Sequence, residues 1–345
     1  MLFDPQFYDP RTSVEHIVAY PYWMMNAEGF STQDFGEDRV ADLCYRTVEY
    51  QTSELSVDEV ILPGRYTNSP TENWFETQSI IANSVTGHNI GVPVYSTLAL
   101  GPDVIAASES LDEIIDEAIA WPTDGVYVVV RHPNSDRFLI ADDVFLYNLL
   151  SALLSLERAG KNVILGYANQ QMLVAAAVGI HGLATGNFRN VRQFNPDMFR
   201  PDGSEPRSRA VWYYDSISLS EFRTNALALA YRRGMDDLFT SSSPFDELLL
   251  SASNPALVRW GERQAFQHYL CCMRRQWTTL QSHRAHDRAR AVIGMLEGAR
   301  RRIDAFGERG FLLGGRSFLP ALEPSESAVS AIASDRAHDL AVNRG

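Results

Sequence analysis

Three short apolar segments alternate with two helical segments between residues 124 and 194. The apolar segments cover residues 125–130, 162–165 and 180–185, and the helical segments cover residues 142–159 and 170–178. Uninterrupted apolar runs that alternate with amphipathic helices are typical of parallel strands that are buried on both faces. This stretch therefore predicts a fold built from repeated strand–helix units.

The same alternation extends over most of the chain. Further strands are predicted at residues 16–20, 57–62, 92–98, 210–214 and 237–240, and further helices at residues 37–50, 74–85, 110–120 and 219–233. Eight strand–helix steps within about 250 residues match a (β/α)8 barrel. An open doubly wound sheet is the rival, but no G-x-G-x-x-G sequence follows any predicted strand. We therefore predict an α/β fold, with a TIM-type barrel over residues 1–253.

A helical extension is predicted to follow the barrel at residues 254–316. It carries 12 arginines against 5 Asp and Glu, whereas residues 1–253 carry 16 Lys and Arg against 34 Asp and Glu. The arginines of the extension either neutralise the phosphates of a nucleic acid or pack against the acidic barrel, and the sequence leaves both open. Residues 317–345 end in an Ala- and Ser-rich stretch and are predicted to be a loosely held tail.

The cysteines and the apolar segments indicate where the protein resides and what it binds. Cys44, Cys271 and Cys272 form no C-x-x-C pair, so the sequence predicts neither a zinc site nor a disulfide framework. No predicted strand end carries paired metal ligands, and we expect no metal and no cofactor. The first residues lack the pattern of a secretory signal, and the apolar stretch at 144–156 is too short to span a bilayer. We expect a cytoplasmic protein that does not enter a membrane.

In a (β/α)8 barrel the functional residues lie where the strands run into the following loops. At these positions the sequence places arginines, amides and aromatic residues, with few carboxylates. Guanidinium groups bind phosphate or carboxylate through paired hydrogen bonds, and aromatic rings stack on bases. The binding residues predicted on this ground are Tyr22, Arg65, Asn68, Arg131, Tyr167, Asn169, Asn187, Arg189 and Tyr214.

His132 and Asp215 are the predicted catalytic residues. His132 follows the strand at 125–130, and imidazole titrates near neutral pH. Asp215 directly follows the strand at 210–214 and could act as a nucleophile, as a base or as the partner of an arginine. Each has a structural alternative, in which the side chain hydrogen-bonds to backbone or caps the next helix. The sole lysine, Lys161, precedes its strand, which argues against Schiff-base chemistry at the rim.

A series of features in residues 124–192 points to a known family. Asp124-Gly-Val-Tyr127 enters a strand, a long helix follows, and Val163-Ile-Leu-Gly166 comes next. A short helix then leads to Val178-Gly-Ile180 and to a loop with Asn and Arg at residues 187–192. This order and spacing resemble the later half of the tRNA-guanine transglycosylase barrel. The resemblance implies a (β/α)8 barrel that engages a nucleobase or a nucleic acid.

Three positions depart from that family. The family uses an Asp nucleophile on the strand occupied here by residues 182–185, and the nearest matching position is Ala184. Val128 and Val129 stand where the family has a glycine pair, and the cysteine-rich zinc site of the family is absent from the sequence. The resemblance therefore extends to the barrel and not to the base-exchange chemistry.

Three functional hypotheses follow. The first is a barrel that engages a nucleotide, nucleobase or nucleic acid at its rim and through the helices at 254–316. The second is a barrel without catalysis that serves as a binding or assembly subunit with a protein partner. The third is a metal-free lyase or isomerase for a small molecule.

Overall fold

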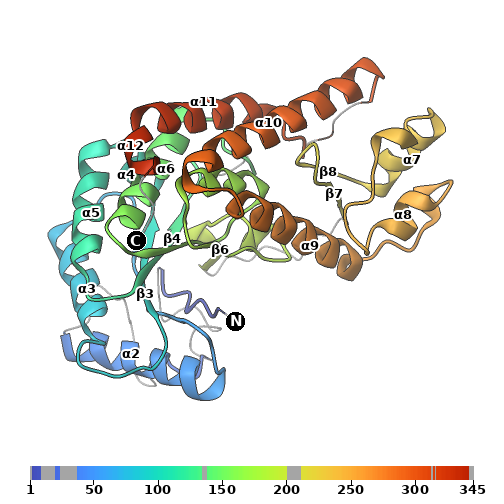
Figure 1. Cartoon of the computed structure of the whole chain (residues 1–345). Coiled ribbons are helices and arrows are strands. Elements are labelled where there is room, and N and C mark those ends of the chain that lie inside the picture. The colour runs from blue at the N-terminus through green and yellow to red at the C-terminus, as the bar shows by residue number, and fades with distance from the viewer. Residues whose placement is uncertain are drawn as a thin grey trace.

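The computed structural model describes residues 2–8, 20–23, 37–133, 138–199, 211–311, 314 and 316–341. A curled parallel sheet lies at its centre and forms a half barrel. Helices cover the outer face of the sheet, and a smaller lobe that holds the β7–β8 hairpin extends to one side (Figure 1). The protein is therefore a mixed α/β fold with a central parallel sheet.

The central sheet has its strands in the order β1, β3, β4, β5, β6, and all neighbours are parallel. A sixth strand, β2, pairs with the carboxyl end of β3 at Ala99 and Leu100, beyond the β1 pairing at Val94 and Tyr95. The strands are β1 (Val60–Ile61), β2 (Tyr66–Thr67), β3 (Val94–Leu100), β4 (Gly125–Val130), β5 (Asn162–Leu165) and β6 (Gly182–Leu183). Because all are parallel, their carboxyl ends share one edge of the sheet.

Helices follow the strands as the hydrophobic periodicity predicts. They are α2 (Glu37–Glu49), α3 (Glu72–Asn83), α4 (Pro102–Ala106), α5 (Ser108–Ala120) and α6 (Asp143–Arg158), with a π-helical turn η1 (Tyr50–Glu54) and a 3-10 helix η2 (Gln170–Val178). Asp142 caps α6, because its carboxylate accepts the amide of Phe145 at 2.9 Å. Every residue of η2 is buried, and its sequence is apolar from Met172 onward. The two glutamines before it donate to the carbonyls of Leu219 and Ile140.

The second half of the chain is largely helical. It contains α7 (Thr224–Arg232), α8 (Glu247–Ser251), α9 (Glu262–Gln281), α10 (Ala285–Glu308), α11 (Leu319–Asp335) and α12 (Ala337–Ala341), with the short 3-10 helices η3 (Arg189–Val191), η4 (Pro196–Phe199), η5 (Asp236–Leu238) and η6 (Pro255–Leu257). Helix α11 packs against α6 and α10 and buries Leu322, Val329 and Ile332. Most of the segment predicted to be a loosely held tail is thus an ordered helix, because its small and branched residues recur on one face.

The two faces of the sheet have different cores. Leu98, Val126 and Leu165 point outward into one large apolar cluster that also takes in α6, η2, α10 and α11. Their neighbours in the strands point to the concave face, where Tyr95 and Tyr127 belong to a second, more aromatic cluster. Because the outer cluster includes the helices at 254–316, these helices bury one face against the half barrel. The helices at 254–316 therefore pack on the half barrel through apolar residues.

The sheet does not close into the predicted eight-stranded barrel. The segment predicted as the seventh strand forms β7 (Tyr213–Asp215), which pairs antiparallel with β8 (Ser220–Phe222). In the described part of the chain, this hairpin is a separate two-stranded sheet. The eighth strand is predicted at residues 237–240, but residues 237 and 238 belong to the 3-10 helix η5, because Leu238 and Phe239 donate to carbonyls three residues earlier. The strand predicted at 16–20 lies outside the described residues apart from Tyr20.

Candidate functional site

The carboxyl edge of the sheet holds a cluster of aromatic residues around one carboxylate. Its ring members are Tyr8, Tyr66, Tyr127, Tyr167 and Phe194, with Asp4 and Arg131 beside them, and we call these seven residues the edge cluster. Phe194 lies among the rings, with its centroid 4.7 Å from that of Tyr8 and 5.3 Å from that of Tyr167. The cluster draws on segments from residue 4 to residue 194, so only the fold brings it together.

The N-terminal segment contributes the carboxylate. Tyr8 runs alongside β2, since its carbonyl accepts the amide of Tyr66 at 2.9 Å. The Tyr8 hydroxyl donates to Asp4 at 2.7 Å, and the amide of Gln6 donates to the other carboxylate oxygen at 2.9 Å. The hydroxyls of Tyr127 and Tyr167 also face Asp4. The half-buried Asp4 side chain is therefore fixed by hydrogen bonds at the concave face.

Two backbone positions are specialised for this arrangement. Tyr167 has a φ of +51°, in the left-handed region that side chains other than glycine rarely adopt. Gly166, just before it, leaves room for the ring of Tyr127, because a Cβ there would overlap the Tyr127 hydroxyl. Unusual backbone conformations of this kind concentrate at functional sites. The conformation at the end of β5 therefore marks this edge as a candidate site.

The surroundings of Asp4 change its proton affinity. Desolvation by burial raises the pKa of the Asp4 carboxyl above its usual value, although the hydrogen bonds from Tyr8 and Gln6 act in the opposite direction. Burial also raises the pKa of the Tyr8, Tyr127 and Tyr167 hydroxyls, so these groups remain donors at neutral pH. A carboxylate with a raised pKa is a typical component of binding and acid–base sites.

Arg131 supplies a positive charge at the same edge. It donates to the Asp197 carboxylate at 2.9 Å, and its side chain is 29% exposed. The Tyr66 hydroxyl lies next to it. A parallel bridge between Arg131 and Phe194 ties the returning chain to the end of β4. The site thus offers a carboxylate, a guanidinium and several flat rings.

Arg131 and Tyr167 are the two predicted binding residues that belong to the edge cluster. Arg65 is buried and donates to Asn73 and Thr77 of α3, and Asn169 is buried and caps η2. Asn68 bonds to Asp103 at the start of α4. The hydrogen bonds of these three side chains join neighbouring elements and so stabilise the fold.

The remaining predicted binding residues lie elsewhere. Tyr22 is buried with Phe7 and donates to the Pro5 carbonyl at 3.1 Å. Tyr214 is buried in the outer cluster and donates to Gln276 of α9 at 3.0 Å. Asn187 is exposed in the loop after β6. Arg189 begins η3, and its side chain lies outside what the structure describes.

The two predicted catalytic residues lie on different sheets. His132 follows β4 and is buried. Asp215 ends β7 in the separate hairpin, where its carboxylate accepts the amide of Ser218 at 3.0 Å. Desolvation raises the pKa of the Asp215 carboxyl. The hairpin placement corresponds to the structural alternative for Asp215, a carboxylate that accepts backbone amides.

A second polar group, around His268 of α9, has the residue types of a catalytic triad. Its Nδ1 lies 2.8 Å from the Ser243 hydroxyl and 3.5 Å from Asp246, and its Nε2 lies 2.6 Å from the Tyr214 carbonyl. Desolvation lowers the pKa of His268. Because the side chains of His268 and Asp246 have no exposed surface, we assign this group to the packing of α9 against β7 and against the loop at residues 241–243.

Among the residues of the site that the sequence did not indicate, Asp4 and Tyr8 come from the N-terminal segment. They lie in a segment with two Asp-Pro pairs, which predicts an irregular lead-in. Its aromatic density, with Phe3, Phe7 and Tyr8 within six residues, is the signal that could have indicated a buried segment.

Comparison with known protein families, with curated proteins and with solved structures finds no match in any of the three. Within the described ranges, no group of three or more His, Cys, Asp or Glu residues is arranged to hold a metal ion. None of the helices in those ranges is both long and apolar enough to cross a membrane.

Proposed function

We propose that the edge cluster binds a nucleobase-bearing ligand, and that the protein acts by binding it. The observation that carries the proposal is the Asp4 carboxylate, held among tyrosine rings at the carboxyl ends of parallel strands with Arg131 nearby. This edge is where ligands bind in parallel α/β folds. The resemblance to transglycosylase-type barrels led to the same class of ligand.

The chemistry of the three group types supports a flat, nitrogen-containing ligand. A carboxylate offers about four acceptor positions. Tyr8 and Gln6 donate to Asp4, and the hydroxyls of Tyr127 and Tyr167 also face it. A pair of adjacent N–H donors on a ligand, such as those on the edge of guanine, would take the place of the Tyr127 and Tyr167 hydroxyls at Asp4. The half-buried ring of Tyr66, beside Arg131, can stack on a base, which is worth about 1–3 kcal/mol per base. Arg131 suits the phosphate of a nucleotide.

The second hypothesis, a binding or assembly subunit, shares one observation with this proposal. His132 and Asp215 lie on different sheets, and Tyr8, Tyr127 and Phe194 are themselves buried on the concave face. The chain's own rings fill the concave face, so this face leaves little room for an enclosed chamber in which a substrate could react. This favours a protein that binds a partner over an enzyme. The two readings differ in the partner, which is a small ligand in one and a protein in the other.

Calorimetric titration with guanosine 5′-monophosphate, inosine 5′-monophosphate and adenosine 5′-monophosphate tests the proposal. We expect the guanine nucleotide to bind best, because inosine lacks one of the two adjacent donors and adenine lacks the pair. Asp4→Asn should weaken guanine binding at least tenfold, since a hydrogen bond to a charged acceptor is worth about 1.5–3 kcal/mol. Arg131→Gln should weaken the nucleotide and leave guanosine unchanged.

The control is Asp42→Asn, which removes an exposed carboxylate that pairs with Arg46 within α2. It should bind the nucleotides as the wild type does. Absence of binding by all three nucleotides at millimolar concentration would contradict the proposal. Equal binding by Asp4→Asn and the wild type would also contradict it.

A further inference from the structure

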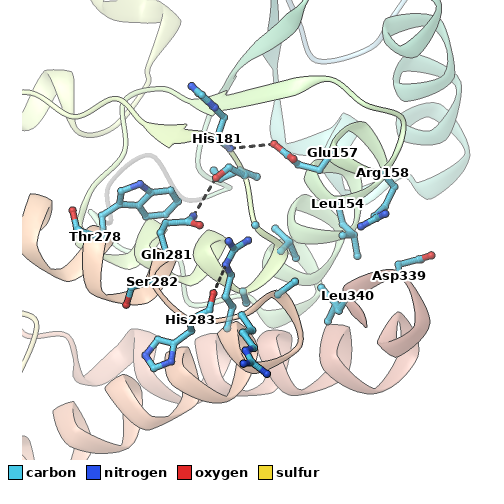
Figure 2. Close-up of a pocket in the computed structure, with 18 residues that line it drawn as sticks. Leu154, Glu157, Arg158, His181, Thr278, Gln281, Ser282, His283, Asp339 and Leu340 are labelled. Carbon is cyan, nitrogen blue, oxygen red and sulfur yellow. Dashed lines mark hydrogen bonds between the residues drawn. The ribbon is translucent and has the colours of Figure 1, made fainter. Parts of the chain in front are cut away.

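A cavity of about 920 Å³ opens at the opposite edge of the sheet from the edge cluster. It lies between the end of α6, the turn before β6, the junction of α9 and α10, and α12 (Figure 2). Figure 2 places Arg158 and Asp339 on one side of the hollow and Gln281 and His283 on the other. Its volume lies within the range of small-molecule sites.

Positive groups predominate in its lining. Arg158, Arg284 and Arg288 line the cavity, and His181 and His283 add two imidazole rings to the lining. The lining contains two carboxylates, and both bond within the fold. Glu157 is buried and accepts the amides of Val163 and His181, each at 3.1 Å. Asp339 pairs with Arg336 at 2.5 Å. An anion that enters the cavity therefore meets an excess of positive charge.

Arg288 is held in place by the backbone around it. Its Nε donates to the carbonyl of His283 at 3.2 Å. Its guanidinium also lies over Gly179, because a Cβ at that glycine would come within 2.6 Å of the Arg288 Nη1. Gly179 has a φ of +76°, so the turn before β6 favours glycine on conformational grounds as well. A guanidinium fixed in this way needs little further ordering to bind an anion.

Two further features suit a phosphorylated organic molecule. The 24-residue helix α10 begins at the cavity. The amides of Asp287 and Arg288 donate its first backbone hydrogen bonds, to the carbonyl of Arg284. The positive end of the helix dipole therefore adds to the arginines. Trp277, Leu154 and Ile180 give the rest of the lining an apolar part. A phosphate ion alone would leave most of the volume unfilled.

We propose that this cavity binds a small phosphate monoester, with its phosphate at Arg284, Arg288 and the start of α10 and its organic part near Trp277. The site is separate from the edge cluster and is independent of the function proposed there. Free phosphate and the ester share the same anionic chemistry, so the experiment compares the two.

Calorimetry with ribose 5-phosphate, inorganic phosphate and ribose tests the site. Ribose 5-phosphate should bind, inorganic phosphate should bind at least tenfold more weakly, and ribose should not bind. Arg284→Gln and Arg288→Gln should each weaken the ester about tenfold, which is the effect of losing one charge-assisted contact. Affinity should also fall as salt is raised.

The matched control is Arg290→Gln, on the same helix but outside the cavity, where the side chain is 84% exposed and pairs with Asp287. It should leave affinity unchanged, as should Asp4→Asn at the other edge. Arg284 is exposed, so its replacement should not unfold the protein, and thermal melting checks this. Equal affinity for ester and free phosphate, or equal losses in the Arg284 and Arg290 variants, would overturn the proposal.

Discussion

Arg192 and Glu221 form an ion pair at 3.0 Å in which both side chains are almost fully buried, with 6% and 3% of their surface exposed. The pair joins the loop after β6 to strand β8. Arg316 reaches the second oxygen of Glu221 at 2.8 Å, and the guanidinium of Arg192 lies 3.4 Å from the ring centroid of Tyr269 in α9. One carboxylate thus links the half barrel, the hairpin and the segment that follows α10.

Replacement of Glu221 by Gln should be strongly destabilising. It would leave the buried guanidinium of Arg192 without its counter-charge, and breaking a buried pair in this way costs about 3–5 kcal/mol. Chemical denaturation followed by circular dichroism measures the loss. The control is Glu297→Gln, whose exposed pair with Arg301 spans 3.8 Å and should contribute less than about 0.5 kcal/mol. Similar losses in both variants would show that burial does not set the strength of the pair.

Replacement of His268 by Gln should change how stability depends on pH. Desolvation lowers the pKa of His268, so the unfolded chain takes up a proton below about pH 6.5 that the folded protein resists. The wild type should therefore lose stability as pH falls from 7 to 5, and His268→Gln should lose less over that range. Denaturation at several pH values compares the slopes. Parallel slopes would mean that His268 is protonated equally in both states.

Asp4→Asn should stabilise the folded protein at neutral pH. Burial raises the pKa of Asp4, so the fold favours the neutral carboxyl, and its ionisation as pH rises costs stability. Asparagine is neutral and can still bond to Gln6 and Tyr8. Thermal melting at pH 7 should rise by about 2 °C, and the gain should vanish below about pH 4. A gain at pH 7 with loss of guanine binding is the expected combination at a functional carboxylate.

Gly166→Ala should destabilise the sheet, because a Cβ would come within 2.6 Å of Cε2 of Tyr127. The Tyr127 ring is buried and has little room to move. Overpacking of this kind costs about 1–3 kcal/mol. In Tyr127→Leu the same glycine replacement should cost less, which a double-mutant cycle measures. Gly294→Ala is the control, since nothing in the described structure lies within 4 Å of a Cβ there and helix α10 should gain about 0.5–1 kcal/mol.

The strands predicted at residues 125–130 and 162–165 match β4 and β5 residue for residue. These segments are buried on both faces, so their sequence has no competing requirement and the apolar run marks their ends directly. The prediction was less accurate at residues 210–240, where short apolar runs form a hairpin, a helix and a 3-10 turn. There the partner of each segment decides its conformation, and Tyr213 pairs with Phe222 instead of joining the sheet.

The candidate site was predictable only in part. Arg131 and Tyr167 follow directly from the rule that functional residues lie at the ends of parallel strands. Asp4 could not be found in this way, because it reaches the edge through the packing of Tyr8 beside β2 and against Phe194. The contact of Tyr8 with Phe194 joins residues that lie more than 180 positions apart in the chain, and no local pattern encodes it.

The amino-acid sequence by itself determined the alternation of buried strands and helices, the parallel arrangement of residues 125–165 and the concentration of arginines after residue 253. These properties depend on periodicity and composition within about twenty residues. The tertiary structure decided that the sheet remains a half barrel, that Asp4 lies among the tyrosines of the concave face and that three arginines line one cavity. Each of these depends on which distant segments pack together, and side-chain shape and burial select that pairing only in the folded chain.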